Sequence, residues 1–182
     1  PGSPRVRAAV ALGLVTLLGV AGFRPYIGHY AEVYAGSLRQ DPRARYSQLP
    51  RSGGVPLAPG EEAAVVYIQQ HTAPGDPIFV GNPRHDLIVV NDLGFYFLAG
   101  RRSPTIYQEL HPGIATTLPV QQEIVARLRA AGVQYVVLVT VWEPREPNLS
   151  AVSSGVTELD AYIRQAYEPC FEAGSYRVLR KR

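Results

Sequence analysis

The chain has 182 residues, 46% of them hydrophobic, which is enough for one domain with a buried core. Its formal net charge is +3, but much of the positive charge lies near the two ends, so the middle is nearly neutral and we expect no nucleic-acid partner. Cys170 is the only cysteine, which excludes an intrachain disulfide. The sequence contains no Met, so we expect it to be part of a longer or processed protein.

The first predicted element is an uncharged apolar run from Ala8 to Phe23, with arginines before it and Arg24 after it. At about 1.5 Å of rise per residue, a helix here covers most of a hydrocarbon layer of about 30 Å, so the run is a short membrane span or a signal-peptide core. The arginine end is expected on the cytoplasmic side, which places the rest of the chain outside the cytoplasm, at the cell membrane. A buried helix of a soluble protein is the alternative, although glycines within the run disfavour it.

The chain then divides into three predicted regions. Residues 1–35 form the membrane-spanning helix and its exit. Residues 36–60 are a linker or an irregular wrap, because Pro, Gly, Arg and Ser become frequent and the hydrophobic period disappears. Residues 61–182 form an extracytoplasmic α/β domain.

The first half of that domain alternates helical and strand patterns. Glu61 to His71 is predicted as a helix with acidic residues in its first turn. Ile78 to Gly81 is a short apolar strand between turn signals. A second helix is expected from Asp92 to Ala99, with Asp92 as its N-cap and Gly100 at its end. Thr105 to Gln108 is a possible second strand.

The second half contains the strongest patterns. Pro119 to Ala131 is predicted as a helix, because apolar residues recur at helical spacing after an early proline. Val133 to Val141 is β-branched and apolar almost throughout, which is typical of a central strand covered on both faces. Thr157 and Asp160 resemble a capping box for a last helix. A hairpin is expected between Phe171 and Leu179.

This order of elements predicts an α/β fold. With right-handed crossovers it forms a small three-layer, Rossmann-like sandwich with a mainly parallel sheet and a C-terminal antiparallel hairpin, preceded by one transmembrane-type helix.

Polar residues follow the three predicted strands. Open α/β sheets bind ligands beyond the carboxyl ends of their strands, so these residues form a candidate ligand rim. A histidine beside carboxylates suits acid–base chemistry or a metal, whereas the simpler interpretation is that loops are polar because they are solvated. The rim consists of Asn82, Arg84, His85, Asp86, Glu109, His111, Trp142 and Glu143.

The sequence lacks the common motifs of catalytic and cofactor sites. There is no G-x-G-x-x-G, P-loop, G-x-S-x-G or H-E-x-x-H pattern, so we expect no cofactor and no metal, and we assign no catalytic residue. Arg84, Arg101 and Arg102 could bind a phosphate, or could simply lie at solvated helix ends.

Several phrases together resemble a known family. They are an apolar helix running outward, YIQQHTAPGDPIFVG, NDLGFYFLAGRRSPTIYQELHPG and QQEIVARLRAAGVQYVVLV. From about Ala8 to its end, the chain is similar to the extracytoplasmic C-terminal domain of bacterial polytopic GT-C membrane glycosyltransferases, related to family 39 protein mannosyltransferases and arabinosyltransferase-like proteins. The resemblance implies transfer of a sugar from a polyprenyl-phosphate donor outside the cytoplasm. The catalytic acid of that family lies in an early loop that this chain does not contain.

The resemblance therefore implies a non-catalytic part that serves acceptor recognition, assembly or stability, with Ala8 to Phe23 as the last membrane span. Its partners would be the lipid bilayer, the remaining membrane helices of the parent protein, and a polyprenyl-phosphate sugar or glycan acceptor. Two alternatives stay open. One is a stand-alone, membrane-anchored ligand-binding module, and the other is a small hydrolase or transferase centred on His85, Asp86 and Glu143.

Overall fold

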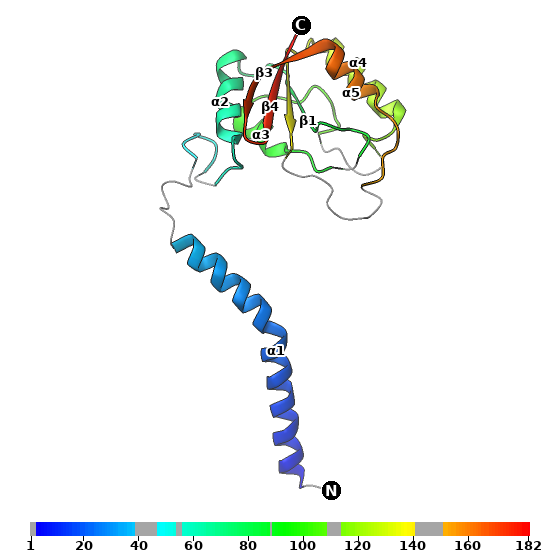
Figure 1. The fold of residues 1–182 in the computed structure, drawn as a ribbon. Coiled ribbons are helices and arrows are strands. Elements are labelled where there is room, and N and C mark those ends of the chain that lie inside the picture. Colours follow the sequence, from blue (N-terminus) through cyan, green and yellow to red (C-terminus); the bar gives the residue numbers. More distant parts are fainter. Residues whose placement is uncertain (1–2, 39–46, 54–55, 88, 109–113, 141–150) are drawn as a thin grey trace. The chain divides into compact units, whose positions relative to one another are not determined.

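The computed structural model describes residues 3–38, 47–53, 56–87, 89–108, 114–140 and 151–182. The chain forms two compact units, Pro1–Tyr46 and Ser47–Arg182 (Figure 1).

In the first unit, the described residues contain one long helix, α1 (Pro4–Leu38), which extends well beyond the predicted apolar run. Its apolar side chains are exposed around the whole circumference; for example, Leu12, Leu17 and Phe23 are 69%, 66% and 66% exposed. Among the residues that the structure describes, no helix combines the length and the apolar composition needed to cross a membrane.

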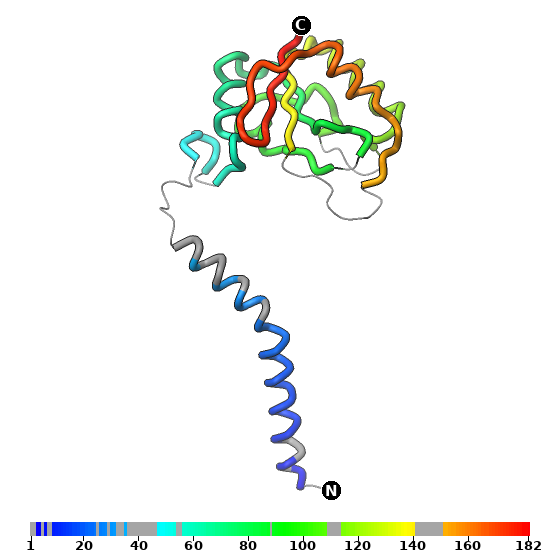
Figure 2. The backbone as a smooth tube through the Cα atoms, in the orientation of Figure 1, coloured from blue at the N-terminus to red at the C-terminus, as the bar shows by residue number. Residues whose placement is uncertain are grey.

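The second unit is built on a four-stranded sheet with the order β1-β2-β4-β3. Only β1 and β2 are parallel, and the other two pairs are antiparallel, so the prediction of a mainly parallel sheet is wrong. The reason is that β3 returns through a tight turn as β4 (Figure 2), which must therefore run antiparallel to β3. Since β4 lies between β3 and β2, which run in the same direction, it is antiparallel to both. The strands are β1 (Phe79–Gly81), β2 (Tyr135–Val139), β3 (Tyr167–Ala173) and β4 (Tyr176–Lys181).

Helices cover both faces of this sheet, as the predicted three layers require (Figure 1). Neighbouring residues of β2 point to opposite faces, so Val137 enters one core and Val136 the other. The first core packs against α2 and α3, and the second packs against α4 and α5. The helices are α2 (Glu61–His71), α3 (Leu93–Ala99), α4 (Leu118–Ala130) and α5 (Glu158–Ala166). The expected helices and the covered central strand are confirmed.

The outer edge of β1 lacks the second strand that the sequence predicted. The carbonyl of Arg102 accepts from the Ile78 N–H at 3.1 Å, and Pro77 and Arg102 form an isolated bridge, but the described residues 103–108 form no strand. Two side chains bond to β1 in place of a strand: the Tyr96 hydroxyl accepts from the Val80 N–H at 2.8 Å, and the Asn91 amide donates to the Val80 carbonyl at 3.0 Å. Because these groups already satisfy the backbone of β1, a fifth strand has nothing to pair with there.

The helix-end predictions have mixed outcomes. Asp92 caps α3 by accepting from the Phe95 N–H at 3.1 Å, and Gly100 ends that helix in the left-handed conformation, as predicted. The predicted capping box of α5 is wrong, because Thr157 makes no side-chain cap bond. Asp160 bonds instead to the segment that follows β1.

Candidate functional site

The carboxyl ends of β1 and β2 lie at the same edge of the sheet, because the two strands are parallel. Four of the eight predicted rim residues are described, and all four follow β1: Asn82, Arg84, His85 and Asp86. The other four, Glu109, His111, Trp142 and Glu143, lie outside the described residues.

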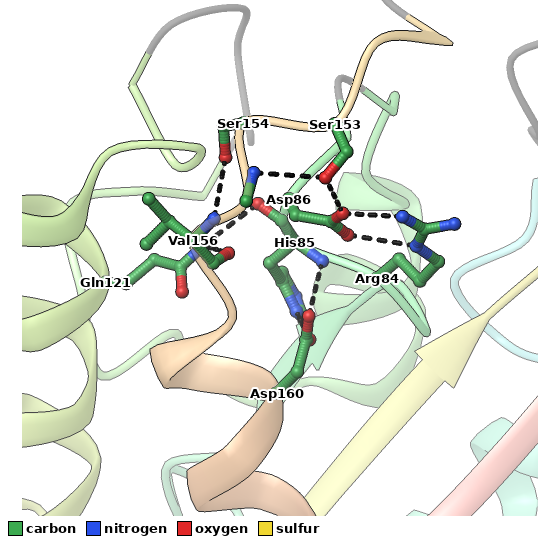
Figure 3. A network of polar contacts seen from close by, with 9 residues as sticks. Arg84, His85, Asp86, Gln121, Ser153, Ser154, Val156 and Asp160 are labelled. Atoms are coloured by element: carbon green, nitrogen blue, oxygen red, sulfur yellow. Dashed lines mark hydrogen bonds and ion pairs between the residues drawn. The ribbon is translucent and has the colours of Figure 1, made fainter.

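His85 is buried and paired with Asp160 of α5 (Figure 3). Its ring atom Nδ1 lies 2.6 Å from Asp160 Oδ1, and its backbone N–H donates to Oδ2 at 3.1 Å. The backbone N–H of Asn82 donates to Nε2 at 3.3 Å, so the ring proton is on Nδ1 and faces the carboxylate. Both ring nitrogens therefore have protein partners, and the pair joins α5 to the exit of β1.

Asp86 makes a second set of hydrogen bonds that connects separate segments at the rim. Arg84 donates to its two carboxylate oxygens at 3.0 and 2.5 Å, and the Ser153 hydroxyl donates to Oδ2 (Figure 3). Asp86 is only 3% exposed, whereas the Arg84 side chain is 59% exposed. The hydrogen bonds from Arg84, helped by the one from Ser153, lower the pKa of Asp86 to about 2. Near neutral pH it is an acceptor and not a proton donor.

This pKa predicts a specific pH dependence for the variant Asp86→Asn. A carboxyl group whose pKa is lower in the folded state stabilises the fold above its ordinary value of 3.8, and this contribution is lost as the pH falls toward about 2. We expect the free energy of unfolding of the variant to be about 1 kcal/mol lower near pH 7. The value is this small because solvent around the exposed Arg84 screens the ion pair. Urea titrations from about pH 7 to pH 2 measure this. A deficit that stays constant over the whole range would contradict the assignment.

Gln121 of α4 holds the same region from the other side of the rim. Its side chain is fully buried, and its amide nitrogen lies 3.0 Å from the carbonyls of His85, Ala115 and Val156. Its amide oxygen accepts from the Leu159 N–H at 2.9 Å. One side chain thus ties the exit of β1, the turn before α4 and the start of α5.

The described rim is therefore a joint between elements and holds no pair of groups prepared for catalysis. Its histidine and carboxylates are buried and hydrogen-bonded, and Arg84 is the charged group that reaches solvent. The described residues also contain no cluster of three or more His, Cys, Asp or Glu side chains that would bind a metal. This geometry favours a positioning role for His85 and Asp86.

Sequence reasoning missed three residues of this joint. Asp160 was assigned to a helix cap, and nothing in the sequence pairs it with His85, which lies 75 positions away. No pattern in the sequence indicates that Ser153 contacts Asp86 either. Gln121 did have one, because it lies three and seven positions before Ile124 and Leu128, on the buried face of α4.

Arg101 is engaged at helix ends and has no donors left for a phosphate. Its guanidinium donates to the carbonyls of Ala99 and Thr72 at 2.9 and 2.8 Å, and to the Thr72 hydroxyl at 2.7 Å. Weaker bonds to Gly100 and Gln69 use its remaining N–H groups. Arg101 thus caps the C-terminal ends of α2 and α3, which carry partial negative charge.

Fold and rim together define a three-layer α/β domain with a mixed four-stranded sheet and a hydrogen-bonded joint at its strand ends. No protein-family model matches the sequence, and no curated protein matches it either.

Proposed function

We propose that α1 anchors the α/β domain to the outer side of a membrane, and that the chain is the C-terminal, non-catalytic part of a membrane glycosyltransferase. In this role the domain contributes to acceptor recognition, assembly or stability of the parent enzyme.

The single observation that carries the anchor is the exposure of apolar side chains on all sides of α1 from Ala9 to Phe23, where the structure describes them. A helix with an apolar stripe packs on its own domain, whereas one that is apolar all round needs an apolar environment on every side. At about 1.5 Å per residue, the run from Ala8 to Phe23 is shorter than a full hydrocarbon layer of about 30 Å. Because α1 alone does not have the length and apolar composition of a span, the anchor requires that further apolar helices of the parent protein pack around it.

Two observations support the glycosyltransferase part. The phrases that resemble the family form α2, β1, α3, α4 and β2, which together build most of the two cores. In addition, the buried, hydrogen-bonded side chains of His85 and Asp86 in the described rim suit a structural role within the parent enzyme.

The anchor predicts where the chain is found in a bacterial cell. With alkaline phosphatase fused to its C-terminus, the chain is expected in the carbonate-resistant membrane fraction with active enzyme, because that reporter folds only outside the cytoplasm. The double variant Leu14→Lys, Leu18→Lys is expected to leave the membrane fraction, since each lysine costs about 2.5–3.5 kcal/mol in the middle of a span.

The matched control is Ile27→Lys with Ala31→Lys, which places the same pair of charges farther along α1, beyond Arg24. This variant is expected to stay in the membrane fraction. Recovery of the wild-type chain as a soluble protein, or an inactive reporter, would contradict the proposal.

The glycosyltransferase part is tested by the coding sequence upstream of Pro1. We expect a continuous reading frame that encodes a series of apolar spans and an acidic residue in an early outer loop. A frame that starts a few codons upstream and adds no span would refute this part. It would favour the stand-alone, membrane-anchored binding module.

A further inference from the structure

A small cavity lies at the sheet edge where β2 ends and the β3–β4 turn begins. Its volume is about 70 Å³, and its walls include Pro83, Leu138, Thr140 and Ser175. Pro83 directly follows Asn82 of the rim, so the cavity adjoins the joint described above. Ligands of open α/β sheets bind beyond the carboxyl ends of the strands, which is where this cavity lies.

The charged side of the cavity is formed by Glu172 and Arg177, which face each other across β3 and β4. The pairing of β2 with β4 places Leu138 opposite Arg177, and the pairing of β4 with β3 places Arg177 opposite Glu172. The Arg177 Nε lies 2.5 Å from a Glu172 carboxylate oxygen, although the two side chains are 55% and 60% exposed. Both groups line the cavity, and both keep hydrogen-bonding capacity: one carboxylate oxygen and the terminal guanidinium N–H groups.

This wall selects against most ligand classes. Glu172 repels an anion and Arg177 repels a cation. A purely apolar group would displace the water that solvates both side chains without replacing its hydrogen bonds. A neutral group with adjacent hydroxyls suits the pair, because one hydroxyl can donate to the carboxylate while the next accepts from the guanidinium. The Thr140 hydroxyl donates to the Ser175 carbonyl at 3.1 Å, so its oxygen can still accept from a ligand.

We infer that this cavity binds one edge of a neutral sugar, with two adjacent hydroxyls on Glu172 and Arg177 and a C–H edge against Leu138 and Pro83. The cavity is too small for a whole ring, so the rest of the sugar stays in solvent. The inference rests on the proposed function and makes it more specific, because it identifies the surface that would recognise a glycan acceptor.

Nuclear magnetic resonance titration of the full chain in a detergent without sugar headgroups tests the inference. The probes are neutral methyl glycosides of mannose, galactose and glucose, with glucuronate, glucosamine and inorganic phosphate as charged comparisons. At least one neutral glycoside is expected to shift the amide signals of Ser175 and Arg177, with a dissociation constant on the order of 1 mM. The charged probes are expected to bind more weakly.

The variant Glu172→Ala is expected to weaken that binding about tenfold, because it removes a hydrogen bond to a charged group. The matched control is Glu168→Ala, which breaks the other exposed cross-strand pair of the same hairpin, with Arg180 at 3.1 Å. It is expected to leave binding unchanged. Equal weakening by both variants, or no shift with any neutral glycoside, would overturn the inference.

Membrane fractionation of the same variants separates this inference from the proposed function. If no glycoside binds while the chain stays in the membrane fraction, the cavity inference fails and the anchor stands. If a glycoside binds to a chain that is found free of the membrane, the anchor fails and the cavity inference stands.

Discussion

Replacing Gln121 by leucine is expected to lower the free energy of unfolding of the α/β domain by about 3–5 kcal/mol. Leucine has a similar volume, so the loss does not come from a cavity. It comes from four backbone groups that lose a partner. Three of these bonds are buried, to the carbonyls of His85 and Ala115 and from the N–H of Leu159, and the bond to the Val156 carbonyl is partly buried. Each unsatisfied buried group costs about 1–3 kcal/mol.

Pulse proteolysis of the full chain in urea measures this loss, because it reports the unfolding of the domain independently of α1. The matched control is Gln122→Leu, the same substitution at the next, exposed position of α4. It is expected to change the free energy of unfolding by no more than about 0.5 kcal/mol. Similar losses in both variants would show that Gln121 does not hold the three elements together.

Replacing Gly174 by alanine is expected to destabilise the domain by about 2–5 kcal/mol, because two costs combine. Gly174 has φ +54°, a conformation that side chains disfavour. In addition, a Cβ atom there would lie 2.2 Å from the Pro59 carbonyl oxygen and 2.7 Å from its carbon. These are backbone atoms, so the segment before α2 or the β3–β4 turn would have to move.

Gly132→Ala separates the two costs. Gly132 has φ +61°, but a Cβ atom there would meet nothing within 4 Å. Only the backbone cost of about 1–2 kcal/mol remains, so the midpoint of urea unfolding should shift much less than for Gly174→Ala. The close contact between the turn and the Pro59 backbone would be refuted if the two variants unfolded alike.

The sequence predicted the elements whose signals are local. The repeat of apolar residues in α4, the β-branched run of β2 and the Asp92 cap each depend on neighbours within about one or two helical turns, and the structure confirms all three. The two covered faces of β2 follow from the same run, because alternate side chains of a strand point in opposite directions.

Predictions that needed distant partners failed more often. The segment after α3 was expected to be a strand, but the side chains of Tyr96 and Asn91 bond to the edge of β1 where that strand would pair. The mainly parallel sheet was expected from the helix–strand alternation, whereas the insertion of β4 between β2 and β3 made two of the three pairs antiparallel.

For the candidate site, the sequence by itself determined that polar residues follow β1 and that β1 is a short buried strand. Only the tertiary structure decided that His85 pairs with Asp160 and that Gln121 binds three separate segments. The physical reason is range. Caps and periodic burial depend on residues a few positions apart, whereas a buried polar group needs a partner that only the packing of distant elements brings within hydrogen-bonding distance.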